Sequence, residues 1–449
     1  MISKPLRFAL LTCSMVALLA GSAAASSFED ALTAAYQTNP RIKSERQKLE
    51  GTDEGVAQAV SGFRPTVTAN YNPSRQRTSF GGAPDVEGNG TTKSLTVSQP
   101  IFRGGGTWSS WQAASQRVKS GQYELSAVEQ QVMLNAVTAY MNVVANSAIL
   151  DLSRKNMGVL DEQLKAATTR FEVGEVTRTD VAQSEARLSA AKTGVIAAEG
   201  QLLSSIAAYE RTMGGKPEGT LTVPDKLPEL PVTLDEALER ARGANPQLLA
   251  ALHNARASEY DVRTNQAQLL PRVSLVGSLS RQDGAGANGS TKFEQDSIGL
   301  QVAIPLYQSG AEYSRVREAE AISRQRKHET IDQRMTNDEA VTQNWEQLES
   351  AIATIVSRND QIKASALALD GVKQEQQYGS RTVLDVLDAE QELFTARTNL
   401  VRAQRDRIVA AYSLAFTLGQ LTPTNLGLQV AQYDPQVHAD DVEWKSIGF

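Results

Sequence analysis

The sequence predicts a mixed, mainly α-helical fold in which one unit, a β-hairpin followed by a long coiled-coil helix hairpin, occurs twice. Three observations predict it: two long stretches without proline, motifs that recur about 206 residues apart, and short segments that alternate apolar and polar residues. Proline is absent between Pro100 and Pro217 and between Pro305 and Pro423. Because a proline inside a helix costs about 3 kcal/mol, both stretches allow long uninterrupted helices.

The recurring motifs indicate a duplicated unit. Asn39-Pro40 recurs as Asn245-Pro246, and a further set has nearly the same spacing: Phe28–Leu32 with Leu234–Leu238, Pro65 with Pro271, Gly174 with Gly379, Asp180 with Asp385, and Gly214 with Gly419. A repeat of this kind is one structural unit used twice. The expected parts are a first repeat at 26–214, a linker at 215–232, a second repeat at 233–419 and a C-terminal tail at 420–449.

Residues 1–25 are typical of a secretory signal peptide. Lys4 and Arg7 precede a short apolar run at 8–20, and Ala23-Ala24-Ala25 offers a cleavage site. The only cysteine, Cys13, lies inside that run. We therefore expect an exported chain whose mature form folds without disulfides.

Composition argues against several functions. The net charge of −6 argues against a nucleic-acid partner, since nucleic-acid binders carry a basic excess. No segment after the signal peptide is an unbroken apolar run long enough to cross a membrane as a helix. The histidines His253, His328 and His438 lie far apart, so we expect no metal site and no cofactor.

Each unit is expected to open with a helix. Ser27 and Thr233 each precede an acidic residue by three positions, which is the spacing of a capping box. A β-hairpin should follow at about 66–101 and again at about 272–307. In the last strand of these hairpins, apolar residues alternate with small or polar ones from Ile298 to Leu306, as in a strand with two unlike faces.

Long helix hairpins are predicted at about 107–213 and 310–418. Across 132–171, ten of the twelve positions on a heptad seam are apolar. The first arm of such a hairpin would reach roughly 100 Å at 1.5 Å per residue. Gly174 and Gly379 interrupt the pattern and mark the turns. A single heptad stretch also fits an ordinary core helix, but the length and the duplication favour coiled-coil hairpins.

Four amphipathic strands in one chain cannot close a membrane barrel, since the smallest barrels have about eight. Open strand edges do not occur in lipid, because unpaired backbone groups are costly there. An exported chain with these strands is therefore expected to form a closed cyclic oligomer, and a trimer would supply about twelve strands. The residues expected to face lipid are Val67, Leu95, Leu275, Leu300 and Val302.

Specific motifs support this arrangement: Arg170-Phe171-Glu172-Val173-Gly174, Thr179-Asp180-Val181, and the run Gly379–Ala389. With them the chain resembles the TolC-like outer-membrane channels of bacterial efflux and type I secretion systems. The resemblance implies a homotrimer with a twelve-stranded β-barrel in outer-membrane lipid, continued by an α-helical barrel that crosses the periplasm. It also implies an equatorial belt containing 215–232 and the tail, and two partners, a periplasmic adaptor (membrane fusion) protein and an inner-membrane transporter.

The candidate site residues lie at the helical turns. Asp385 and Asp388 are three positions apart just after the second turn, where the helix dipole alone already favours one aspartate. The resemblance implies that this pair lines a constricted entrance as a carboxylate ring. It also implies that Arg381 is a gating arginine whose partners on a neighbouring hairpin lie near Thr179 and Asp180. Gln376 departs from the family pattern, because an aromatic gating residue is expected there.

Transport is expected rather than catalysis. Arg103-Gly104-Gly105-Gly106 lacks the Gly-Lys-Ser/Thr sequence of a phosphate-binding loop, and no catalytic constellation is present in the sequence. The alternative function is a soluble periplasmic coiled-coil adaptor protein. That alternative accounts for the heptads but not for two alternating hairpins in one chain.

Overall fold

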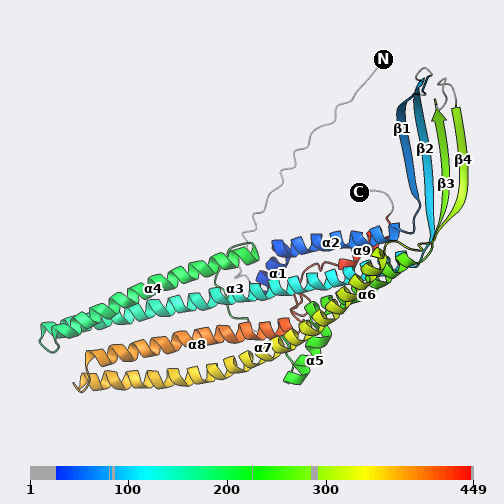
Figure 1. The fold of residues 1–449 in the computed structure, drawn as a ribbon. Coiled ribbons are helices and arrows are strands. Elements are labelled where there is room, and N and C mark those ends of the chain that lie inside the picture. Colours follow the sequence, from blue (N-terminus) through cyan, green and yellow to red (C-terminus); the bar gives the residue numbers. More distant parts are fainter. Residues whose placement is uncertain (1–26, 80, 83–85, 225, 285–291, 446–449) are drawn as a thin grey trace, which may run out of the picture.

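The computed structural model describes residues 27–79, 81–82, 86–224, 226–284 and 292–445. The predicted signal peptide lies outside these residues. Within them, a four-stranded sheet stands at one end of the molecule, and two long helix hairpins extend to the other end (Figure 1). Shorter helices pack around the middle (Figure 1).

The helix hairpins have unequal arms. The first consists of α3 (Gly106–Glu172) and α4 (Arg178–Met213), and the second of α7 (Ala311–Gln377) and α8 (Val383–Thr417). Helices α3 and α7 have 67 residues each, which corresponds to roughly 100 Å. Part of α3 is apolar enough to cross a membrane, but half of that stretch is buried, as in a core helix.

The sheet is antiparallel throughout, with strand order β1-β2-β3-β4. Its strands are β1 (Thr66–Thr78), β2 (Val86–Arg103), β3 (Arg272–Asp283) and β4 (Lys292–Ala303). The predicted alternation in the last strand ran to Leu306, but β4 ends at Ala303. Pro305 explains the difference, since proline has no N–H to continue a ladder.

The strand register gathers the apolar residues on one face. Val67 pairs with Val97, which pairs with Gly277, which pairs with Ile298. The neighbouring rows on this face are also largely apolar. Leu95 pairs with Ala69 on one side and with Leu279 on the other. Leu275 pairs with Leu300, and Val273 pairs with Val302. These side chains are open to solvent in the single chain, and Ile298 is 79% exposed. An apolar sheet face of this extent indicates a membrane or protein interaction surface.

Short helices repeat the same packing in both units. α1 (Phe28–Thr38) leads into α2 (Pro40–Ser61), and α5 (Leu234–Ala244) leads into α6 (Pro246–Gln266). The asparagine between each pair caps the second helix and donates from its side-chain amide to the end of a return helix. Asn39 Nδ2 donates to Thr212 O at 3.1 Å, and Asn245 Nδ2 donates to Thr417 O at 3.0 Å. The two Asn-Pro motifs therefore make equivalent connections between a pair of short helices and the end of a return helix.

The predicted capping boxes differ from each other. Ser27 and Asp30 exchange both hydrogen bonds of a capping box. At the second site, Thr233 accepts from the Glu236 N–H at 3.3 Å, but the Glu236 carboxylate accepts from the N–H of Val232 instead of Thr233. The spacing identified both helix starts but not this shift of the acidic partner by one residue.

The main core lies in the middle of the molecule. Leu32, Met133 and Tyr140 are buried there together with Leu421, which comes from the C-terminal segment. The Tyr140 hydroxyl donates to the carbonyl of Thr222 at 3.0 Å. The segment between the repeats and the start of the tail therefore pack into the core of the first unit.

The tail ends in helix α9 (Pro435–Glu443), which packs beside α2. His438 Nδ1 lies 3.0 Å from the buried Asp53 carboxylate. The Trp111 indole N–H donates to Glu443 at 3.0 Å. These contacts hold the described part of the tail against α2 and α3.

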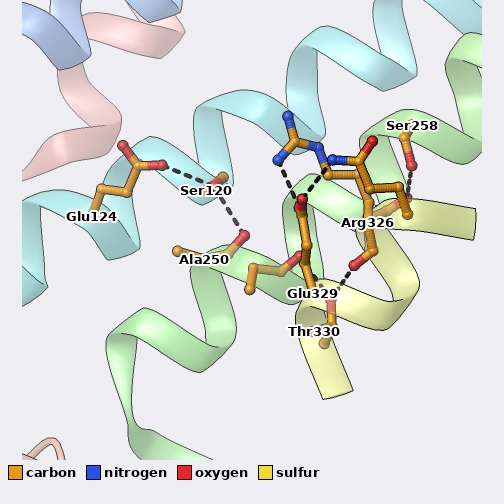
Figure 2. Close-up of polar contacts among 10 residues, drawn as sticks. Ser120, Glu124, Ala250, Ser258, Arg326, Glu329 and Thr330 are labelled. Atoms are coloured by element: carbon orange, nitrogen blue, oxygen red, sulfur yellow. Dashed lines mark hydrogen bonds and ion pairs between the residues drawn. The ribbon is translucent and has the colours of Figure 1, made fainter. Parts of the chain in front are cut away.

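Helix α6 is held between α3 and α7 by side-chain hydroxyls. Ser120 of α3 donates to the carbonyl of Ala250 at 3.0 Å, and Thr330 of α7 donates to that of Ala251 at 3.3 Å (Figure 2). On α7 itself, Arg326 pairs with Glu329 at 2.8 Å (Figure 2). The adjoining groove of about 480 Å³ is lined by charged side chains that pair with each other, Lys48 with Glu124 and Arg326 with Glu329.

Sharp junctions join the strands to the long helices. Gly104 and Gly105 have φ values of 62° and 79°, and Ser309 and Gly310 have φ values of 57° and 79°. Two successive left-handed residues turn the chain abruptly, and glycine adopts this backbone without strain. The glycine-rich segment at 103–106 is therefore a defined bend between β2 and α3.

We expect Gly419→Ala to destabilise the fold. Gly419 has φ 72°, and a Cβ there would lie 2.3 Å from the carbonyl oxygen of Ala244. The expected loss is about 1–3 kcal/mol in the free energy of unfolding, measured by urea denaturation in detergent. The control is Gly371→Ala inside α7, where nothing lies within 4 Å and a gain of about 0.5–1 kcal/mol is expected. Equal effects of both changes would contradict this account.

Candidate functional site

The candidate site is the helical tip, where both hairpin turns lie at the end of the molecule away from the sheet (Figure 1). A buried cluster joins the two hairpins near this end. It contains Leu160 of α3, Leu188 of α4, and Val383 and Leu387 of α8. Apolar contact between the hairpins thus positions the charged residues of both turns.

The first turn follows α3. Gly174 has φ 81°, and the N–H of Glu175 donates to the carbonyl of Arg170 at 2.8 Å. Thr177 then caps α4 in a capping box with Asp180. The Asp180 carboxylate accepts from the Thr177 N–H at 2.8 Å and from its hydroxyl at 2.7 Å. Asp180, a predicted partner of the gating arginine, is therefore hydrogen-bonded to Thr177 within its own turn.

The second turn has the same design. Gly379 has φ 78°, and the N–H of Ser380 donates to the carbonyl of Glu375 at 3.0 Å. Thr382 caps α8, and the Asp385 carboxylate accepts from the Thr382 N–H at 2.9 Å and from its hydroxyl at 2.8 Å. These hydrogen bonds, the backbone one first, lower the pKa of Asp385. Asp385 is therefore the acidic partner in the capping box of α8, three positions after the N-cap Thr382.

Arg381 pairs within its own turn. Its Nε donates to the Glu375 carboxylate at 2.8 Å, and both side chains are about half exposed, at 50% and 53%. The hydrogen bond with Glu375 raises the pKa of Arg381. Thr179 and Asp180 belong to the other hairpin, so a link from Arg381 to them across neighbouring hairpins stays a prediction. Sequence reasoning missed Glu375, although it lies only six positions before Arg381.

Asp388 is paired across the two hairpins. Its carboxylate accepts from the guanidinium of Arg187 on α4. Two positions further along α8, the largely buried Glu390 pairs with Lys373 of α7. The two predicted entrance carboxylates therefore differ: Asp385 belongs to the capping box of α8, and Asp388 has its charge balanced by Arg187. No sequence signal links Arg187 to Asp388, because the pair is 201 positions apart.

An aromatic side chain does occur at the tip, although not at the expected position. Gln376, where an aromatic residue was expected, lies in the last turn of α7, and its carbonyl accepts from the N–H of Gly379 at 3.0 Å. Two residues further on, Tyr378 is 89% exposed. The described tip therefore presents an exposed aromatic residue between Glu375 and Arg381 in the sequence of the turn.

The family profile described as outer membrane efflux protein matches this chain twice, at residues 31–215 and 237–420. The outer membrane efflux protein BepC of Brucella suis is 36% identical over 96% of this chain and 94% of its own length. The alkaline protease secretion protein AprF of Pseudomonas aeruginosa is 24% identical over 93% of this chain and 89% of its own length.

Solved structures share the fold. A structure of CusC aligns with a TM-score of 0.80 at 17% identity, covering 88% of this chain and 92% of that one. The outer membrane protein VceC of Vibrio cholerae aligns with a TM-score of 0.76 at 18% identity, covering 87% and 96%. Because the family profile covers both repeats and the BepC match spans nearly the whole chain, this chain belongs to the outer membrane efflux protein family.

Proposed function

We propose that this protein is the outer-membrane exit duct of a tripartite efflux or type I secretion system. It passively conducts molecules from an inner-membrane translocase across the periplasm and the outer membrane, and it carries out no catalysis. The observation that carries the proposal is a four-stranded sheet with one exposed apolar face, joined by sharp bends to helices of roughly 100 Å. The family membership and the name of the relative AprF, a secretion protein, support it.

The duct is a trimer. β1 and β4 form the edges of the sheet in one chain, and strand edges must be paired in lipid. Three chains related by a threefold axis would pair each β4 with the β1 of a neighbour and close about twelve strands. The apolar face would then contact lipid, and the face of hydroxyl and amide side chains would line the lumen.

The helical tip is the gated entrance. Arg381 holds the resting state through partners on a neighbouring hairpin near Thr179 and Asp180, and the Asp385 and Asp388 carboxylates line the constriction. Exposed ion pairs are individually worth about 0–1 kcal/mol, so a docking partner can release them. The periplasmic adaptor and the inner-membrane transporter are the partners that act on this tip.

The equatorial belt consists of residues 215–232 and the C-terminal tail. The packing of Leu421 in the core and of α9 on α2 supports this assignment, since both segments lie around the middle of the molecule (Figure 1). The alternative function, a soluble periplasmic adaptor, is not favoured. It would leave apolar residues such as Ile298, Leu300 and Val302 in water on one continuous sheet face.

Purified protein should form conducting trimers. Native mass measurement in detergent is expected to give three chains, and addition to planar lipid bilayers is expected to give discrete current steps. Both results follow from closure of the open sheet edges. A stable folded monomer without channel activity would contradict the proposed function.

Leu300→Arg should impair assembly. Leu300 lies on the exposed apolar face and pairs with Leu275, so the charge would enter lipid at a cost of about 2–4 kcal/mol. Its neighbour Gln301 lies on the polar face, which makes Gln301→Arg the matched control. The yield of trimer in outer membranes is expected to fall several-fold for the first variant only. Equal tolerance of the two arginines would show that the assignment of the faces is wrong.

Arg381→Ser should raise the resting single-channel conductance without loss of trimer. The matched variant is Glu375→Gln, which breaks the same ion pair within the turn but leaves Arg381 free to bind a neighbouring hairpin. A gate formed between neighbouring hairpins predicts higher conductance only for Arg381→Ser. Higher conductance in both variants would place the closing contact in the Arg381–Glu375 pair within one turn, and unchanged conductance in both would remove Arg381 from the gate.

A further inference from the structure

The polar face of the sheet is uncharged except at its base. The strand register places hydroxyl, amide, small and a few apolar residues on this face. Among the described strand residues, its only charged side chains are those of Arg103 and Arg272. Both lie where the strands meet the helices.

These two arginines lie directly opposite each other in the β2–β3 ladder. Like charges in this position destabilise a sheet. Within the part of the chain that the structure describes, neither guanidinium has an ion-pair partner. Arginines on the other face do have one: Arg75 pairs with Glu87 at 2.8 Å, and Arg281 pairs with Glu294 at 3.5 Å.

A cavity of about 840 Å³ opens at this place. Arg103, Arg272 and Arg315 line it, together with the single carboxylate of Glu312. Arg315 donates to the side-chain oxygen of Gln268 at 3.5 Å, which is a weak contact and leaves its charge uncompensated. The cavity wall therefore carries an excess of positive charge.

The backbone around the cavity is tightly constrained. Gly104, which follows Arg103, has φ 62°, and a Cβ there would lie 2.6 Å from the carbonyl oxygen of Ala267. On the other side, Ser309 adopts the left-handed φ of 57°, a conformation that costs a non-glycine residue energy. The bend after Arg103 therefore fixes the position from which its side chain leaves the backbone.

We propose that Arg103, Arg272 and Arg315 form an anion-binding site inside the duct, at the junction of barrel and tunnel, for the carboxylate, phosphate or sulfate groups of molecules in transit. The planar guanidinium forms paired hydrogen bonds with such groups. The site rests on the proposed function, because closure into a trimer places three copies of this cluster around one lumen. Such a ring raises the local concentration of anions.

The test measures single-channel currents in planar bilayers under a KCl gradient, with inorganic tripolyphosphate as the anionic probe. The double variant Arg103→Gln with Arg272→Gln should shift the reversal potential toward cation selectivity. It should also need about tenfold more tripolyphosphate for half-block, since charge-assisted contacts are lost. Arg281→Gln, on the lipid-facing side, is the control and should behave like wild type. Arg272→Lys should keep the selectivity, because it retains the charge.

Unchanged selectivity and unchanged block in the double variant would overturn the inference and assign the arginines to pairing with a neighbouring chain. If the double variant fails to assemble, the single variant Arg315→Gln, on the exposed start of α7, should show the same shift of the reversal potential toward cation selectivity. An unchanged reversal potential in this variant would also overturn the inference. A wild-type protein that forms no channels would instead contradict the proposed function.

Discussion

The constraint on which this structure depends is the need to pair every backbone N–H and C=O of a strand that enters lipid. The described part of one chain forms a four-stranded sheet with two open edges, β1 and β4. Neither edge is compatible with a bilayer core, where an unpaired backbone group costs several kcal/mol. The apolar face of the sheet and its open edges therefore both support the proposed closed ring of chains.

The duplication lets one chain supply equivalent parts of such a ring. Asn39 and Asn245 make the same hydrogen bond to the end of a return helix in each unit. Gly214 and Gly419 end those return helices with the same left-handed backbone, against the ends of α1 and α5. These contacts recur because both units connect the same helices and must reverse the chain at the same point of the repeat.

The helical tip and the junction of sheet and helices differ in their electrostatics. At the helical tip, Arg381 and Asp388 have partners within the chain and remain substantially exposed, so their contacts are weak and reversible. At the junction of sheet and helices, Arg103 and Arg272 face each other without a carboxylate partner in the described chain. The first arrangement suits a contact that opens and closes, and the second suits a fixed site for a mobile anion.

The sequence alone determined the features that depend on periodicity. Alternation with period two placed Leu95, Leu300 and Val302 on one sheet face, and the register agrees. Heptad spacing and the absence of proline predicted the long helices, and the glycine positions marked their turns. These patterns are local, since they follow from backbone geometry and from the exclusion of apolar side chains from water.

Only the tertiary structure decided which charged groups meet. Arg187 and Asp388 are brought together by the packing of Leu188 against Val383 and Leu387. Glu375 reaches Arg381 because Gly379 reverses the chain between them. Arg103 and Arg272 become neighbours through the β2–β3 register. Partners of this kind could not be predicted from spacing, because a charge pairs with whichever group the folded backbone places within a few ångströms, and no sequence period encodes that distance.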